Sequence, residues 1–150
     1  MRSPTIAASV IAVALTACSP QQPAVDLTST GRFDPVQDRA RVLYCLQVHM
    51  AFDRLGREVF GMDEAAVAAE EKKAFERSLR LRPFGTVIDL VEAREEGALF
   101  SEASRTNHEF NNAYASRSLV PGAKPKLWAE LIERSEKCDA LVQAWGPAPL

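Results

Sequence analysis

The chain has 150 residues, of which 18 are Lys or Arg and 20 are Asp or Glu, so its formal net charge at neutral pH is -2. Charges of both signs are interspersed along the sequence, without a basic excess. Nucleic-acid-binding proteins concentrate basic residues on one face, so this composition excludes that class of partner. The length suits one domain with a single hydrophobic core.

The beginning of the chain carries its most informative pattern. Arg2 is followed by a ten-residue apolar run at 6–15, and residues 15–18 read Leu-Thr-Ala-Cys. A membrane-spanning helix needs about 20 apolar residues, so this run is too short to cross a bilayer. An ordinary secretory signal shares the charged start and the short apolar core, but it leaves the cysteine directly after Leu-Thr-Ala unexplained.

Residues 1–18 resemble the signal peptide and lipobox of bacterial lipoproteins. The resemblance implies that residues 1–17 are removed and that Cys18 receives fatty acyl chains such as palmitate. Two or three acyl chains make a stable lipid anchor. Ser19, where Asp would signal retention, implies sorting to the outer membrane, facing the periplasm, in preference to the inner membrane. The cut also removes Arg2 and leaves 133 residues with a formal charge of -3.

Residues 18–32 are expected to form the lipidated cysteine and a flexible tether. They are rich in Pro, Gln, Ser and Thr and show no apolar period. A flexible tether of this length spans about 20 Å root-mean-square. The folded domain is therefore expected at 33–150, close to the bilayer surface.

The first helix of this domain is predicted to begin at Asp34, with Pro35 at the first helical position and Gln37 in a capping box. Gly56 is expected to fray the helix and Gly61 to end it. One face is predicted from residues spaced 3, 4, 3 and 4 apart, namely Cys45, Val48, Phe52, Leu55 and Val59.

Asp63 is predicted to cap a second helix, and Pro83 with Gly85 to end or kink it. Thr86 and Asp89 then offer a new cap for a third helical segment. The inward face of the second helix is expected to consist of Ala65, Ala68, Phe75 and Leu79.

A fourth helix is predicted from Ser101 to about Arg117, with Phe110, Ala113 and Tyr114 inward, followed by a loop at 120–125. The last helix should run to Trp145, where Gly146 stops it. Its stripe is Trp128, Leu131, Ser135, Cys138, Val142 and Trp145. Since sustained period-two alternation is absent from the sequence, the fold is predicted to be all-α, a small antiparallel bundle of four to five helices.

Once Cys18 is lipidated, Cys45 and Cys138 are the remaining cysteines, and each lies on the apolar stripe of its helix. In an oxidising compartment, the even count favours a structural disulfide between the first and last helices. Two buried thiols that pack as small hydrophobic groups are the alternative. A redox-active pair is disfavoured because the sequence has no Cys-x-x-Cys.

His49 and His108 are the only histidines, and His49 precedes Met50. His and Met side chains on different helices of a bundle permit a b-type haem site. His49 lies off the predicted stripe, which favours a half-exposed polar residue or a satisfied contact at the core edge. No cofactor is therefore predicted, and haem or another small ligand stays the alternative function.

Catalytic and metal sites are not predicted. Ser104 and His108 are four residues apart and could face each other, but no nucleophile elbow or third orienting residue accompanies them. Glu109, Asn111 and Asn112 lack the number and spacing that would indicate a metal. We therefore expect a protein without enzymatic activity.

Arg77, Arg80 and Arg82 form a basic cluster that could contact an anionic headgroup, peptidoglycan or a protein, or could simply be a solvated helix end. Trp128 and Trp145 are expected in the core, with Trp145 partly exposed. Together these features predict a non-enzymatic envelope lipoprotein that acts as a binding or structural module. Its expected partners are the membrane, through the lipid anchor, and a protein or another envelope component.

Overall fold

The computed structural model describes residues 25–28 and 31–149, and every regular element in them is helical. The predicted all-α bundle is therefore confirmed for this part of the chain. The elements are α1 (Arg39–Met50), a π-helix η1 (Arg54–Val59), α2 (Glu64–Val91), α3 (Ala98–Ser118) and α4 (Ala123–Trp145). The predicted lipobox, with Cys18, lies outside the described residues.

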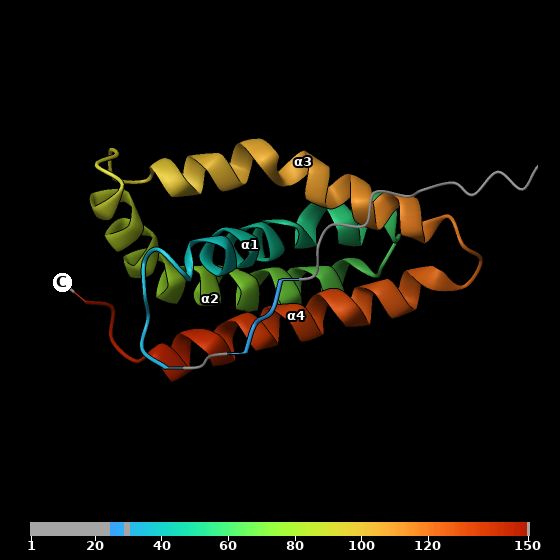
Figure 1. The fold of residues 1–150 in the computed structure, drawn as a ribbon. Helices are drawn as coiled ribbons and strands as arrows, with labels where there is room; N and C mark the ends of the chain where they lie inside the picture. Colours follow the sequence, from blue (N-terminus) through green and yellow to red (C-terminus); the bar gives the residue numbers. More distant parts are fainter. Residues whose placement is uncertain (1–24, 29–30, 150) are drawn as a thin grey trace, which may run out of the picture.

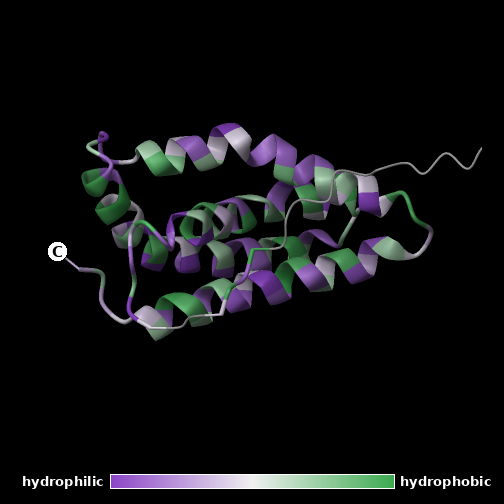
Figure 2. Cartoon of the chain, viewed as in Figure 1, coloured by the Kyte–Doolittle hydropathy of each residue, from purple (hydrophilic) through white to green (hydrophobic). Residues whose placement is uncertain are grey.

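Helix α1 is the centre of the bundle, with α3 on one side of it and α2 and α4 on the other (Figure 1). The core is apolar and continuous from α1 to α4. Much of α3 is hydrophilic, whereas the end of α2 that leads into the loop before α3 is hydrophobic (Figure 2). At this end, Leu90 and Val91 are 73% and 55% exposed.

The N-terminal cap of α1 differs in detail from the prediction. Asp34 Oδ1 accepts hydrogen bonds from the backbone N–H groups of Val36 and Gln37 at 2.9 and 3.0 Å, as a capping residue does. The Asp34 N–H donates the reciprocal hydrogen bond to the Asp38 carboxylate at 2.8 Å, so Asp38 replaces Gln37 as the acceptor. The residues between them form a turn, and the α-helix begins at Arg39.

The helix continues past Gly56 as the wider η1, so the predicted fraying at this residue is wrong. Gly56 is buried, and a Cβ atom placed there would lie 2.8 Å from Val67 Cγ2 and 3.0 Å from Trp128. Glycine is therefore required by the close approach of α2 and α4. Gly61, with φ of 61°, follows the end of this helix as predicted.

Asp63 caps α2, as predicted, by accepting a hydrogen bond from the Ala66 N–H at 3.2 Å. However, α2 is one α-helix from Glu64 to Val91, so of the predicted end or kink at Pro83 and Gly85 the end, with a separate third helix after it, is wrong. Phe84 packs edge-on against Phe33, with ring centroids 4.9 Å apart, and burial of this kind outweighs the one backbone hydrogen bond that proline removes.

The predicted inward face of α2 is also wrong. Phe75 is 64% exposed and Leu79 is 48% exposed, and Ala65 and Ala68 are exposed as well. The buried face consists instead of Val67, Ala74, Leu81, Phe84 and Ile88. Helix α2 therefore has two apolar faces, and the core covers only one of them.

Asp89 does not cap a third helix in its own segment. It is buried on α2, and its carboxylate accepts hydrogen bonds at 2.9 Å from the backbone N–H groups of Gly97 and Leu99. Helix α3 consequently begins at Ala98, before the predicted Ser101. Phe110 and Tyr114 are buried in it as predicted, and Ala113 is half-buried.

Helix α4 confirms its predicted stripe, because all six residues from Trp128 to Trp145 on that stripe are buried. It begins at Ala123, inside the predicted loop, with Pro125 in its first turn. The predicted disulfide is formed: Cys45 of α1 and Cys138 of α4 are joined, with Cα atoms 5.6 Å apart. Both cysteines are fully buried.

A short part of the expected tether contacts the bundle. Val25 and Leu27 are partly buried against the core, and Arg41 Nε donates a hydrogen bond to the Asp26 carbonyl oxygen at 2.7 Å. Two apolar side chains and one hydrogen bond from the Arg41 side chain thus hold residues 25–28 against the bundle.

Candidate functional site

A groove of about 740 Å³ runs between α1, α2 and the beginning of α3. Helix α1 contributes Leu46 and Met50, and Phe75 and Leu79 of α2 and Phe100 of α3 line it as well. Phe75, Leu79 and Phe100 are 64%, 48% and 54% exposed, respectively. Large apolar side chains at this exposure indicate a surface that binds something, because soluble proteins rarely expose contiguous apolar patches.

Two charged side chains of the groove have no partner among the residues that the structure describes. Arg82 of α2 and Glu96, in the loop before α3, both line it, and neither side chain makes an ion pair or hydrogen bond within the described part of the chain. Both residues are exposed. They are therefore available to a ligand or partner of suitable charge.

Carboxylates are in excess where η1 begins. Asp53 and Glu71 line the groove, and both pair with Arg57. Arg57 also pairs with Glu64 at 3.1 Å, so one guanidinium serves three carboxylates and the cluster has a formal charge of -2. The hydrogen bonds that Arg57 donates to these carboxylates, of which the one to Glu71 has the largest effect, raise the pKa of Arg57.

His49 lies in the wall of the groove and is 9% exposed. Its Nδ1 is 3.2 Å from Ser135 Oγ, and Ser135 Oγ also accepts a hydrogen bond from Arg77 at 2.9 Å. Burial, and after it the positive charge of Arg77, lowers the pKa of His49 to about 4. The imidazole is thus neutral at pH 7, and of the two predicted environments the satisfied contact at the core edge is the one found.

The other histidine lies elsewhere. His108 is exposed on α3, and its Nδ1 is 2.9 Å from the carbonyl oxygen of Arg105 in its own helix. The structure does not bring His49 and His108 together, and no hydrogen bond joins Ser104 to His108 in the described residues. Among residues 25–28 and 31–149, no group of three His, Cys, Asp or Glu side chains could hold a metal ion.

The three arginines of the predicted basic cluster separate in the structure. Arg77 donates to Ser135, and Arg80 pairs with Asp139 of α4 at 2.8 Å. Only Arg82 lies in the groove. The cluster is therefore not a single basic surface, because two of its members link α2 to α4.

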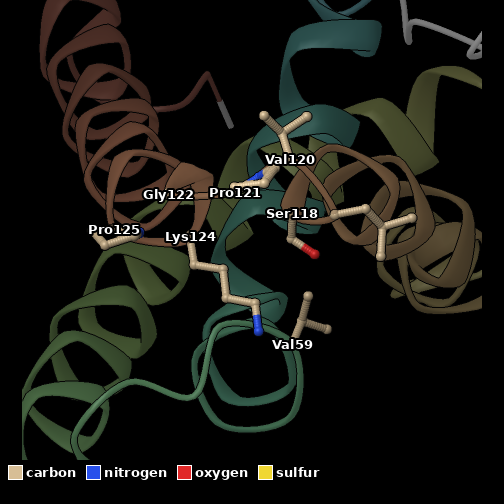
Figure 3. A pocket seen from close by; sticks show the side chains of 8 residues that line it. Val59, Ser118, Val120, Pro121, Gly122, Lys124 and Pro125 are labelled. Carbon is tan, nitrogen blue, oxygen red and sulfur yellow. The ribbon is translucent and has the colours of Figure 1, made fainter.

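A second, shallow hollow of about 570 Å³ lies at the end of the bundle where α3 connects to α4. Lys124 of α4 extends across it toward Val59 of η1, and Ser118 of α3 lines it as well (Figure 3). Leu119 and Val120 of this connection are 83% and 62% exposed. These two side chains project from a loop tip, and the hollow lacks the facing helical walls of the groove.

The groove was not anticipated from the sequence, because Phe75 and Leu79 were assigned to the core. One signal could have revealed it: the apolar residues of α2 fall into two sets, each with helical spacing.

Comparisons with protein-family models, with curated proteins and with solved structures gave no match. In the described part of the chain, no helix combines the length and hydropathy that a membrane span requires.

Proposed function

We propose that this protein is a lipid-anchored, non-enzymatic binding module of the bacterial cell envelope, and that the groove is its binding site. The observation that carries the proposal is the exposure of Phe75, Leu79 and Phe100 along one groove. Burial of such side chains by a partner is favourable by about 1.5 to 3 kcal/mol for each one that is fully covered.

The lipobox-like segment supports the envelope location. Acylated Cys18 would hold the mature chain on the outer membrane, on its periplasmic side, since Ser19 follows the cysteine. The disulfide between Cys45 and Cys138 fits this location, because disulfides persist in oxidising compartments such as the periplasm.

The environments of the candidate nucleophiles support a role in binding. Ser135 is fully buried and shares its hydroxyl between Arg77 and His49, so no substrate reaches it. His108, four residues after Ser104, has its Nδ1 atom 2.9 Å from the backbone carbonyl oxygen of Arg105 in its own helix.

The alternative function is a bundle that binds a small ligand or b-type haem. A volume of about 740 Å³ falls within the range of small-molecule sites, and both His49 and Met50 line the groove. As neighbours on α1, these two side chains cannot bind opposite faces of one haem iron. A haem bound here would need a second axial ligand from a residue other than the His and Met that line the groove. This requirement favours a partner over haem as the occupant.

The anchor is tested with a Cys18→Ser variant produced in a bacterium that processes lipoproteins. We expect the wild-type protein in the outer-membrane fraction and the variant in the soluble periplasmic fraction. The helical circular dichroism should be the same in both, since Cys18 is expected to precede the folded domain in the sequence. A variant that stayed with the membrane would refute the lipid anchor.

The binding function is tested by native purification of the wild-type protein and of Leu79→Gln, followed by mass spectrometry of bound proteins and small molecules. We expect a protein partner that is retained by the wild type and lost from the variant. Absorbance near the Soret band would instead establish haem. Identical sets of bound molecules in both preparations would refute the groove as the binding site.

A further inference from the structure

Helix α2 carries a second, largely apolar stripe beside the groove. Phe75, Leu79, Thr86 and Leu90 are spaced 4, 7 and 4 residues apart, so they share one face of the helix, and the first three of them line the groove. From the first to the last, the stripe is about 22 Å long at the α-helical rise. Leu90 is 73% exposed, and the end of α2 that carries it is hydrophobic (Figure 2).

Three helices contribute apolar side chains to the groove. Leu46 and Met50 of α1, Phe75 and Leu79 of α2 and Phe100 of α3 line it together. Packed helices need apolar ridges at spacings of three and four residues on both partners, and α2 presents such a ridge. Recognition of amphipathic helices in apolar grooves uses these anchors.

Negative charge lies at both ends of the stripe. At one end, Asp53 and Glu71 belong to the cluster in which Arg57 serves three carboxylates. At the other end, Glu96 lines the groove without an ion pair in the described residues. Arg82 is the one Arg or Lys side chain among the groove residues. A partner with Lys or Arg beside its apolar face is complementary to this arrangement.

From these observations we infer that the groove binds a basic amphipathic helix of another protein, roughly 15 residues long. This inference rests on the proposed function, whose binding site it specifies.

Charge and exposure argue against other occupants. A second copy would bring the same acidic ends against each other, and like charges at an interface are unfavourable. An anionic membrane surface is disfavoured for the same reason. A small ligand is ordinarily buried by 70–90% or more, whereas this groove leaves Phe75 and Phe100 more than half exposed. A bound helix would cover these exposed side chains.

The test uses the mature chain released from its anchor by Cys18→Ser and two synthetic fluorescein-labelled 18-residue helical peptides. Both peptides carry leucines on one face, and they differ only in having Lys or Glu beside that face. Binding is measured by fluorescence anisotropy. The groove variant is Leu79→Gln, and the matched control is Leu119→Gln, which makes the same change at an 83% exposed leucine of the loop between α3 and α4.

We expect the Lys peptide to bind at least about tenfold more tightly than the Glu peptide, with an affinity that falls as salt is added. Leu79→Gln should weaken its binding about tenfold or more, as loss of an interface anchor does, and Leu119→Gln should leave it unchanged. Equal binding of both peptides, or an effect of Leu119→Gln alone, would overturn the inference.

Two other outcomes overturn the basic helix while leaving a binding function intact. The first is a dimer, seen by light scattering, that Leu79→Gln dissociates, because a second copy then occupies the groove. The second is a lipid or other amphiphile that is recovered with the wild type and lost from Leu79→Gln. The proposed function is tested by native purification of the anchored protein, which uses neither peptide. Failure of the basic-helix inference and failure of the proposed function are therefore distinguishable.

Discussion

Removal of the disulfide should cost this domain a large part of its stability. Cys45 and Cys138 are 93 residues apart in the sequence. Closure of a loop of this length removes enough conformational entropy from the unfolded chain to contribute about 4.5 kcal/mol at 25 °C. The free energy of unfolding of a small domain is about 5–15 kcal/mol, so the bond would supply a third or more of it. Both cysteines are fully buried, and reduced thiols would keep most of their packing.

The assay is urea unfolding of the oxidised protein and of protein unfolded, reduced and refolded with a reductant. Trp128 and Trp145 are buried and report unfolding by their fluorescence. At a typical dependence on urea, the expected loss lowers the midpoint by about 2 M or more. The double variant Cys45→Ala/Cys138→Ala should resemble the reduced protein, with a further loss from missing sulfur contacts. A difference of less than about 1 kcal/mol between oxidised and reduced protein would refute this reasoning, as would two reactive thiols in the unfolded, unreduced protein.

Two further predictions concern packing and pH. Gly56→Ala should destabilise the protein by about 1–3 kcal/mol, because its Cβ would lie 2.8 Å from Val67. Gly85→Ala, where the nearest atom is 3.9 Å away, should stabilise α2 by up to about 1 kcal/mol; urea unfolding measures both. The folded pKa of His49, about 4, lies below its ordinary value of 6.5, so the unfolded chain binds the proton first as the pH falls. The contribution of neutral His49 to the free energy of unfolding is therefore fully present above pH 6.5 and is lost as the pH falls toward 4. The expected loss between pH 7 and pH 4.5 is about 2 kcal/mol. His49→Gln should lack this part of the pH dependence.

The comparison of wild type with variant is essential for His49. Hydrogen bonds from Arg39 to Glu92 and Glu102 lower the pKa of both carboxyl groups, so acid weakens these pairs as well. The difference in pH dependence between wild type and His49→Gln removes this shared part. Parallel pH profiles would show that His49 is protonated equally in both states. For the glycines, equal effects of the two alanine substitutions would contradict the close contact at Gly56.

Local patterns in the sequence predicted most of the helical framework. The stripe of α4 could be predicted because its apolar residues follow one period over its whole length and are all buried on one face. The left-handed conformations of Gly61 and Gly146 follow the ends of two helices, as glycine permits. The pairing of Cys45 with Cys138 is predicted by the even cysteine count and an oxidising compartment, and both cysteines lie on the predicted stripes.

Tertiary contacts decided what the sequence did not predict. Asp89 has the spacing of a local cap, but its carboxylate binds backbone groups eight and ten residues further on. Pro83 ends a helix in isolation, yet Phe84 beside it packs against Trp145, with ring centroids 5.2 Å apart, and α2 continues. The candidate site depends on α1, α2 and the beginning of α3 meeting along one groove, which no local pattern specifies.

The wrong assignment of the α2 face has the same physical origin as the groove. Two apolar sets with helical spacing lie on this helix, and propensity does not distinguish them. Long-range contacts determine which of the two sets is buried. Val67 lies against Gly56, where only a glycine allows the approach, and Phe84 contacts both Phe33 and Trp145. Once that face is buried, Phe75 and Leu79 must remain outside. A helix that needed only to complete this core would carry polar residues there, so the second apolar face is best explained by a partner that covers it.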